Sequence, residues 1–144
     1  MNLLEVRTYL AVSDLETFSD QYRQLINLIA SFSVPLFRAG MLPPLYGGSI
    51  VFRQDVDYGQ GIENLLPPQV IAARGYGDCD QLATYRIGEL LAAGCDASAT
   101  LADWSGTGEI HAQVRLPGGE VEDPSIILGA PTTWPNWFLY DKGK

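Results

Sequence analysis

Residues 78–93 carry a helix signal that is bounded at both ends. Asp78 is suited to the N-cap, and Gln81 stands three positions later, which is the spacing of a capping box. Gly94 supplies the stop, because glycine readily adopts the left-handed conformation that follows many helices. Between these ends the apolar side chains recur at helical spacing: Leu82, Ala83, Ile87, Leu90 and Leu91. We therefore predict a helix here, with one face packed on a core.

Strands are predicted after this helix, so the fold class is α+β. Residues 97–104 read as a strand, residues 105–108 as a turn, and residues 109–116 as a second strand. The second strand alternates, with Ile110, Ala112, Val114 and Leu116 on one face and His111, Gln113 and Arg115 on the other. After the turn at 117–119, residues 120–123 are expected to return antiparallel.

The length of the 117–119 turn decides which side chains meet. A three-residue loop pairs Leu116 with Glu120, so that Gln113 lies opposite Asp123 on the face that also carries His111. His111 and Asp123 are then diagonal neighbours, about 7–8 Å apart at the backbone, a gap that their side chains can close. A two-residue loop would place them on opposite faces.

The first half of the chain predicts a strand over 2–12 and then a helix capped by Ser13 or Asp14. The apolar positions of this helix follow one stripe: Leu15, Phe18, Tyr22, Leu25, Ile26, Ile29 and Phe32. Pro35 is expected to end or kink it, and Gly40 to mark its exit. Residues 41–68 are dense in Pro, Gly and Tyr and form a loop with a short strand over 50–53. Such a loop is either the wall of a site or a clip over the core.

Composition narrows the classes of function. A chain of 144 residues with 47% hydrophobic and 18% charged residues is expected to form one soluble domain. The net charge of −8 argues against a nucleic-acid partner, because phosphate binding needs clustered positive charge. No apolar run approaches the roughly 18 residues of a membrane span, and Met1–Glu5 lacks the basic start of a signal peptide. A chain kept in a cytoplasm, or packaged into a particle assembled there, is the expectation.

The two cysteines are not expected to pair. Cys79 starts the predicted helix and Cys95 lies just past its end, roughly 24 Å away, well beyond the ~7 Å limit for a disulfide. The same separation, with a single histidine in the chain, argues against a zinc site that uses both. No metal and no cofactor are expected. Cys95 reads as a small core residue.

Cys79, His111 and Asp123 together suit a nucleophile, a base and an orienting carboxylate. A helix N-terminus and a nearby imidazole favour the thiolate, so we expect Cys79 to titrate below the ~8.5 of a free cysteine. Asp78 and Asp80 oppose this unless they point away. Each residue also has a plain structural interpretation: a buried filler for the cysteine, a surface imidazole for the histidine and a turn start for Asp123-Pro124.

Several short segments of the chain resemble the transglutaminase-like cysteine superfamily. They are Arg74-Gly75-Tyr76-Gly77-Asp78-Cys79, His111-Ala112 and Glu122-Asp123-Pro124-Ser125, within roughly residues 70–128. The resemblance implies a papain-like α+β core with Cys79 as nucleophile, His111 as base and Asp123 as orienter. One departure is Gln113, where many relatives carry an aromatic residue.

A narrower resemblance is to small tailed-bacteriophage proteins of that superfamily. It rests on Pro43-Pro44-Leu45-Tyr46, Val51-Phe52-Arg53-Gln54, the Gly-Asp-Cys-Asp helix start and Leu128-Gly129. It implies a head, neck or tail component, located in the host cytoplasm or in the assembled virion. The domain is then divided into an N-terminal part over 1–69, a catalytic-type core over 70–128 and an aromatic tail over 129–144.

Two functions from different classes follow. The first is an enzyme that transfers or hydrolyses an acyl group on a protein or peptide, with the Cys79 N–H as one oxyanion donor. The second donor is left open among Gln54, Gln60 and Gln69. The alternative is a virion structural protein with little or no catalysis, docked onto other virion proteins through the tail residues Trp134, Trp137 and Tyr140.

Overall fold

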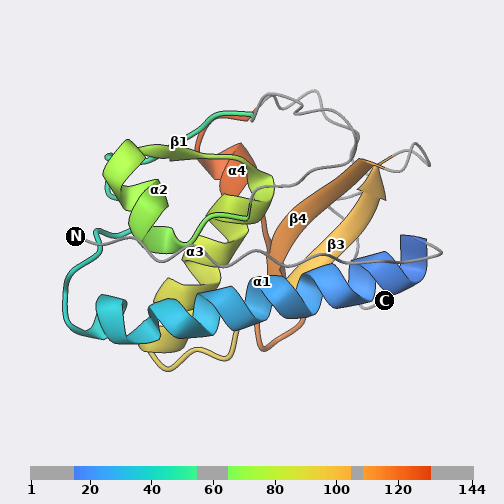
Figure 1. Ribbon diagram of the computed structural model, residues 1–144, viewed down its shortest axis with the longest axis horizontal. Helices are drawn as coiled ribbons and strands as arrows, with labels where there is room; N and C mark the ends of the chain where they lie inside the picture. Colours follow the sequence, from blue (N-terminus) through green and yellow to red (C-terminus); the bar gives the residue numbers. More distant parts are fainter. Residues whose placement is uncertain (1–14, 55–64, 105–108, 131–144) are drawn as a thin grey trace.

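The computed structural model describes residues 15–54, 65–104 and 109–130. These residues form a mixed α+β fold, as predicted, and Figure 1 shows its arrangement. The helices are α1 (Leu15–Arg38), α2 (Pro68–Arg74), α3 (Cys79–Ala92) and α4 (Pro124–Ile127). The strands are β1 (Val51–Phe52), β2 (Tyr76–Gly77), β3 (Ser98–Trp104), β4 (Glu109–Arg115) and β5 (Val121–Glu122). The strand predicted over 2–12, the Ser13/Asp14 cap and the 105–108 turn lie outside the described residues.

The strands form two separate sheets. β3, β4 and β5 make an antiparallel sheet in that order, and β1 pairs with β2 in parallel. Val114 pairs with Glu122 and Arg115 with Val121, and the Leu116 N–H donates to the carbonyl of Glu120. This is the register of the three-residue loop, the alternative that places His111 and Asp123 on one face.

The long α1 helix packs against α3 and against β3 (Figure 1). Their apolar side chains form one buried cluster: Tyr22, Ile26, Ala30, Ala83, Ile87, Ala97, Ala99, Ala112 and Val114. Gly88 allows the two helices to approach closely, because a Cβ there would lie 2.1 Å from Ser33 Oγ. A second cluster joins α3 to α2 and the 41–50 segment through Leu45, Ile50, Ile71, Leu82 and Tyr85. Among the described residues, no helix is long and apolar enough to cross a membrane.

Two expectations for α1 are wrong. Pro35 does not end the helix: it lies inside α1, which continues to Arg38 before Gly40, the expected exit, takes a left-handed φ of 71°. Proline removes a single backbone donor, and the carbonyl of Ser31 that loses its partner is on an exposed residue, where water replaces the bond. Phe32 is 70% exposed, since the buried stripe runs through Tyr22, Ile26 and Ala30 to Ser33 instead.

Sequence analysis missed two short helices. α2 begins with Pro68 at its first position and ends at Gly75, whose φ is 82°. Proline at the start and glycine just past the end are the usual helix boundaries, so the signal was present. α4 begins immediately after Asp123, which acts as its N-cap rather than only starting a turn.

Candidate active site

The α3 N-terminus presents Cys79 as its first residue. Asp78 Oδ1 accepts from the Gln81 N–H at 3.4 Å, and Gln81 Oε1 accepts from the Asp78 N–H at 3.1 Å, so the predicted capping box is confirmed. The backbone N–H groups of Cys79 and Asp80 belong to the first turn, which has no helical acceptors. Neither has an acceptor within the described parts of the chain. They are donors available to an anion that forms beside the sulfur.

The Cys79 thiol lies against β4. The backbone N–H of Ala112, which belongs to the peptide bond that follows His111, donates a hydrogen bond to the sulfur. Cys79 is half-buried, and both cysteines are free thiols. This contact joins the start of α3 to the strand that carries the histidine.

His111 and Asp123 form a direct buried pair. His111 Nε2 lies 2.7 Å from Asp123 Oδ2, and the side chain of His111 is 1% exposed. The hairpin register creates this contact, because it places Asp123 beyond β5 opposite Gln113. The interpretation of His111 as a surface imidazole is therefore wrong, because the imidazole is buried against Asp123 at the start of α4.

Asp123 is surrounded by hydrogen-bond donors. Oδ1 accepts from the N–H groups of Ser125 at 3.0 Å and Ile126 at 3.3 Å, which is the N-cap of α4. Oδ2 accepts from Gln113 Nε2 at 3.1 Å and faces His111 Nε2 at 2.7 Å. Donors on every side suit a carboxylate anion. An ionised Asp123 requires that His111 carry its proton on Nε2.

The electrostatics of Cys79 reverse the sequence-based expectation. Burial raises the pKa of the thiol well above its ordinary value, and the nearby carboxylates of Asp80, Asp78 and Asp123 raise it further. The hydrogen bond from Ala112 lowers the pKa but does not offset these effects. The flanking aspartates thus act against the helix N-terminus, and the sulfur is held as the neutral thiol.

Asp80 is fixed beside Cys79 by a distant part of the chain. Its Oδ2 accepts a hydrogen bond from the hydroxyl of Tyr22, on α1, and its Oδ1 accepts from the Gln81 N–H at 2.9 Å. The carboxylate is 5% exposed. Because both oxygens are bonded, Asp80 cannot turn away from the thiol without losing these bonds.

The segment that leads into Cys79 is clamped by two arginines. The guanidinium carbons of Arg53 and Arg74 lie 4.3 Å and 4.2 Å from the centre of the Tyr76 ring. Arg74 Nε also donates to the Tyr76 carbonyl at 2.8 Å, and its Nη2 donates to Gln81 Oε1. These contacts tie β1 and α2 to β2, two residues before the α3 cap, and so fix the direction in which α3 begins.

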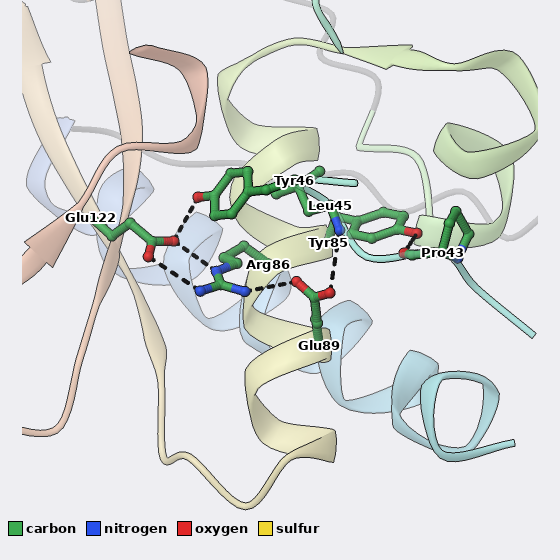
Figure 2. Close-up of polar contacts among 7 residues, drawn as sticks. All are labelled: Pro43, Leu45, Tyr46, Tyr85, Arg86, Glu89 and Glu122. Carbon is green, nitrogen blue, oxygen red and sulfur yellow. Dashed lines mark hydrogen bonds and ion pairs between the residues drawn. The ribbon is translucent and has the colours of Figure 1, made fainter. Parts of the chain in front are cut away.

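A second polar network fixes the strand before Asp123 (Figure 2). Arg86 on α3 binds both oxygens of Glu122 and also Glu89 Oε1, with its shortest contacts at 2.8 Å. The Tyr46 hydroxyl donates to Glu122 Oε2 at 2.7 Å. Burial and this bond raise the pKa of Tyr46, while the pKa of Arg86 is raised because its carboxylate partners outweigh its burial. Glu122 is thereby anchored to α3 one residue before Asp123.

The roles of the other predicted site residues stay predictions. Gln54 and Gln69 are exposed, and neither side chain is hydrogen-bonded within the described residues. Gln60 and the tail residues Trp134, Trp137 and Tyr140 lie outside those residues. Within the described ranges, no group of three His, Cys, Asp or Glu side chains could hold a metal ion.

The sequence placed Gln113 opposite Asp123, but no role was predicted for Gln113 or for Ser125. Gln113 Oε1 and Ser125 Oγ are buried and have no hydrogen-bond partner in the described part of the chain. The alternation of β4 placed Gln113 on the same face as His111, which was the available signal. No comparable signal singled out Ser125.

No protein-family model, curated protein or solved structure matches the chain. The geometry of Cys79, His111 and Asp123 therefore carries the functional argument.

Proposed function

We propose that this chain is a transglutaminase-like protein that transfers or hydrolyses acyl groups through Cys79, His111 and Asp123 on a papain-like core. The observation that carries the proposal is the buried 2.7 Å pair of Asp123 and His111, the latter on the strand that also contacts the Cys79 sulfur. A nucleophile beside a base that is itself oriented by a third group is the usual arrangement for covalent catalysis.

The chemistry uses a thiol that is neutral before reaction. As the sulfur attacks the carbonyl carbon of an amide or ester, its proton moves to His111 Nδ1, because Nε2 is bonded to Asp123. The oxyanion accepts from the N–H of Cys79. Collapse of this intermediate breaks the carbonyl–nitrogen or carbonyl–oxygen bond, and the leaving group takes the proton from His111. Water or an amine then releases the acyl group from the sulfur.

The raised pKa of Cys79 favours base-assisted attack over a preformed thiolate–imidazolium pair. Asp80 and Asp78 disfavour a negative sulfur. Proton transfer to His111 then accompanies attack, as in serine hydrolases. The reactivity of such a thiol depends on His111, toward a small electrophile as toward a bound substrate.

The substrate class and the setting follow from the resemblance noted above. A protein amide or a cell-wall peptide is the acyl donor, and the protein acts in the host cytoplasm or as part of a tailed-phage virion. Nucleic acid is not proposed as a partner.

The second candidate is a virion assembly protein that retains the fold with little or no catalysis. Two observations favour it. The raised pKa of Cys79 opposes reactivity, and α1 exposes Leu28 and Phe32, one turn apart, at 50% and 70%. Exposed apolar side chains at this spacing suit contact with another protein.

A labelling experiment separates the two. The rates at which chloroacetamide alkylates Cys79 and Cys95 are measured by peptide mass spectrometry between about pH 5 and about pH 9. For the enzyme we expect Cys79 to react roughly tenfold faster than Cys95 near neutral pH, and this advantage to disappear in His111→Ala. Cys95→Ala is the matched control and should leave the Cys79 rate unchanged.

An activated ester tests turnover directly. The enzyme should release alcohol in a burst equal to the protein concentration, and Cys79→Ala should abolish it. If Cys79 reacts no faster than Cys95 and no burst is seen, the assembly role is favoured.

A further inference from the structure

Gln113 occupies an unusual place beside the His111–Asp123 pair. It lies two residues after His111 on β4, faces the same side and is 1% exposed. Its Nε2 lies 3.1 Å from Asp123 Oδ2, the same oxygen that His111 Nε2 faces at 2.7 Å. One carboxylate oxygen therefore lies within hydrogen-bond distance of both side chains.

The orientation of the Gln113 amide follows from its neighbour. A carboxylate only accepts hydrogen bonds, so the amide nitrogen must face Asp123 and the amide oxygen must face away. Oε1 is then buried with no hydrogen-bond partner among residues 15–54, 65–104 and 109–130. A buried carbonyl without a donor costs free energy that largely offsets the bond made by Nε2. Stability alone therefore does not account for a glutamine at this position.

The bond from Gln113 instead affects the orientation of the Asp123 carboxylate. The N–H groups of Ser125 and Ile126 fix Oδ1, but a carboxylate held at one oxygen can still tilt about that end. The Gln113 bond fixes the second oxygen, and with it the plane of the carboxylate that His111 meets. Thr100 lies opposite Gln113 on β3, so a neighbouring strand runs beside the glutamine.

We propose that Gln113 is a positioning residue. It holds Asp123 Oδ2 in line with His111 Nε2, so that the imidazole keeps its proton on Nε2 and presents Nδ1 as the base for Cys79. This inference rests on the proposed function for its catalytic meaning, although the effect on His111 can be measured whether or not Cys79 reacts.

The chain offers a direct readout, because His111 is its only histidine. In protein grown with nitrogen-labelled histidine, the two imidazole signals report the tautomer of one residue. We expect wild type to show a single Nε2–H tautomer with a slowly exchanging Nε2 proton. In Gln113→Met, which keeps the volume and removes both polar atoms, the exchange of this proton should accelerate and the tautomers should mix.

Reactivity and stability should separate in the same variant. The Cys79 alkylation rate in Gln113→Met should fall severalfold, up to the roughly tenfold loss expected for His111→Ala, because Gln113 acts through His111. The urea midpoint should stay close to wild type, because the lost hydrogen bond is offset by removal of the unpaired oxygen. Val114→Ala, on the opposite face of β4, is the matched control: it should lower the urea midpoint and leave the His111 signals unchanged.

The outcomes are distinct. An unchanged His111 spectrum and unchanged Cys79 rate in Gln113→Met overturn the positioning role, even if Cys79 and His111 are shown to be catalytic. Loss of fold in both Gln113→Met and the shorter amide variant Gln113→Asn assigns a packing role instead and also overturns it. A changed His111 spectrum in a protein whose Cys79 is unreactive supports the positioning role and counts against the proposed function alone.

Discussion

Replacing the Asp123 carboxylate by an amide, Asp123→Asn, should leave the protein folded and remove the reactivity of Cys79. The carboxylate accepts from two backbone N–H groups at Oδ1 and meets two side-chain nitrogens at Oδ2. An asparagine has one accepting oxygen and one donating nitrogen, so it can serve one of these ends as an acceptor but not both.

The N-cap of α4 determines how the asparagine side chain of Asp123→Asn is oriented. If the asparagine oxygen stays on the α4 N–H groups, its nitrogen faces His111 and Gln113. Both can adapt: the Gln113 amide flips to present Oε1, and the imidazole moves its proton from Nε2 to Nδ1. Every bond is then re-formed without charge. The reverse orientation loses the cap, worth about 0.5–2 kcal/mol, and points a donor at two donors.

The free energy of unfolding should therefore change by no more than about 1–2 kcal/mol, the difference between charged and neutral hydrogen bonds. Reactivity has no such compensation. A proton on Nδ1 occupies the nitrogen that must accept the thiol proton, and a wrong tautomer of this kind costs about 10⁴ in rate in a serine triad.

Urea unfolding gives the free energy, and the burst of alcohol from the activated ester gives the rate of Cys79 acylation. The labelled His111 signals should show the Nδ1–H tautomer. An Asp123→Asn protein with wild-type reactivity would refute the reasoning, and so would one destabilised by more than about 4 kcal/mol with its histidine tautomer unchanged.

Three further changes test other parts of the structure. Gly88→Ala should lower the free energy of unfolding measured in urea by about 1–3 kcal/mol, because the steric clash of a Cβ 2.1 Å from Ser33 Oγ outweighs the ~1 kcal/mol gained in helix propensity. Equal stability would contradict the close approach of α1 and α3. The free energy of unfolding of wild type should fall as pH rises above about 8.5, by up to ~1.4 kcal/mol per pH unit. The reason is that the raised pKa keeps the Cys79 thiol protonated in the folded state, while the thiol of the unfolded chain ionises. Cys79→Ala should remove this fall between about pH 8.5 and about pH 10, and equal slopes would argue against the raised pKa. Glu122→Gln should lower the free energy of unfolding by about 1–3 kcal/mol, because it weakens the contacts with Arg86, and thermal and urea melts should show that the loss shrinks in high salt. No change would mean that the network does not fix β5.

Several features of the site were predictable because they depend on neighbours along the chain. The Asp78–Gln81 capping box is a local pattern, and so is the turn that sets Gln113 opposite Asp123. From these two features the sequence predicts a cysteine at a helix start and, if the loop has three residues, a histidine beside an aspartate. The prediction failed for Pro35 and Phe32, where the packing of α1 on α3 overrode the local signal.

The remaining features depend on contacts between distant parts of the chain. Sequence alone determined which residues start α3, because the cap forms within a few residues, and it limited the β4–β5 hairpin to two possible loop lengths. Tertiary structure decided the charge state of Cys79: Tyr22 lies 58 positions from Asp80 and holds its carboxylate beside the sulfur, while the packing around the thiol removes water. Desolvation and the field of nearby charges depend on what surrounds a group in space, and no local pattern in the sequence specifies that.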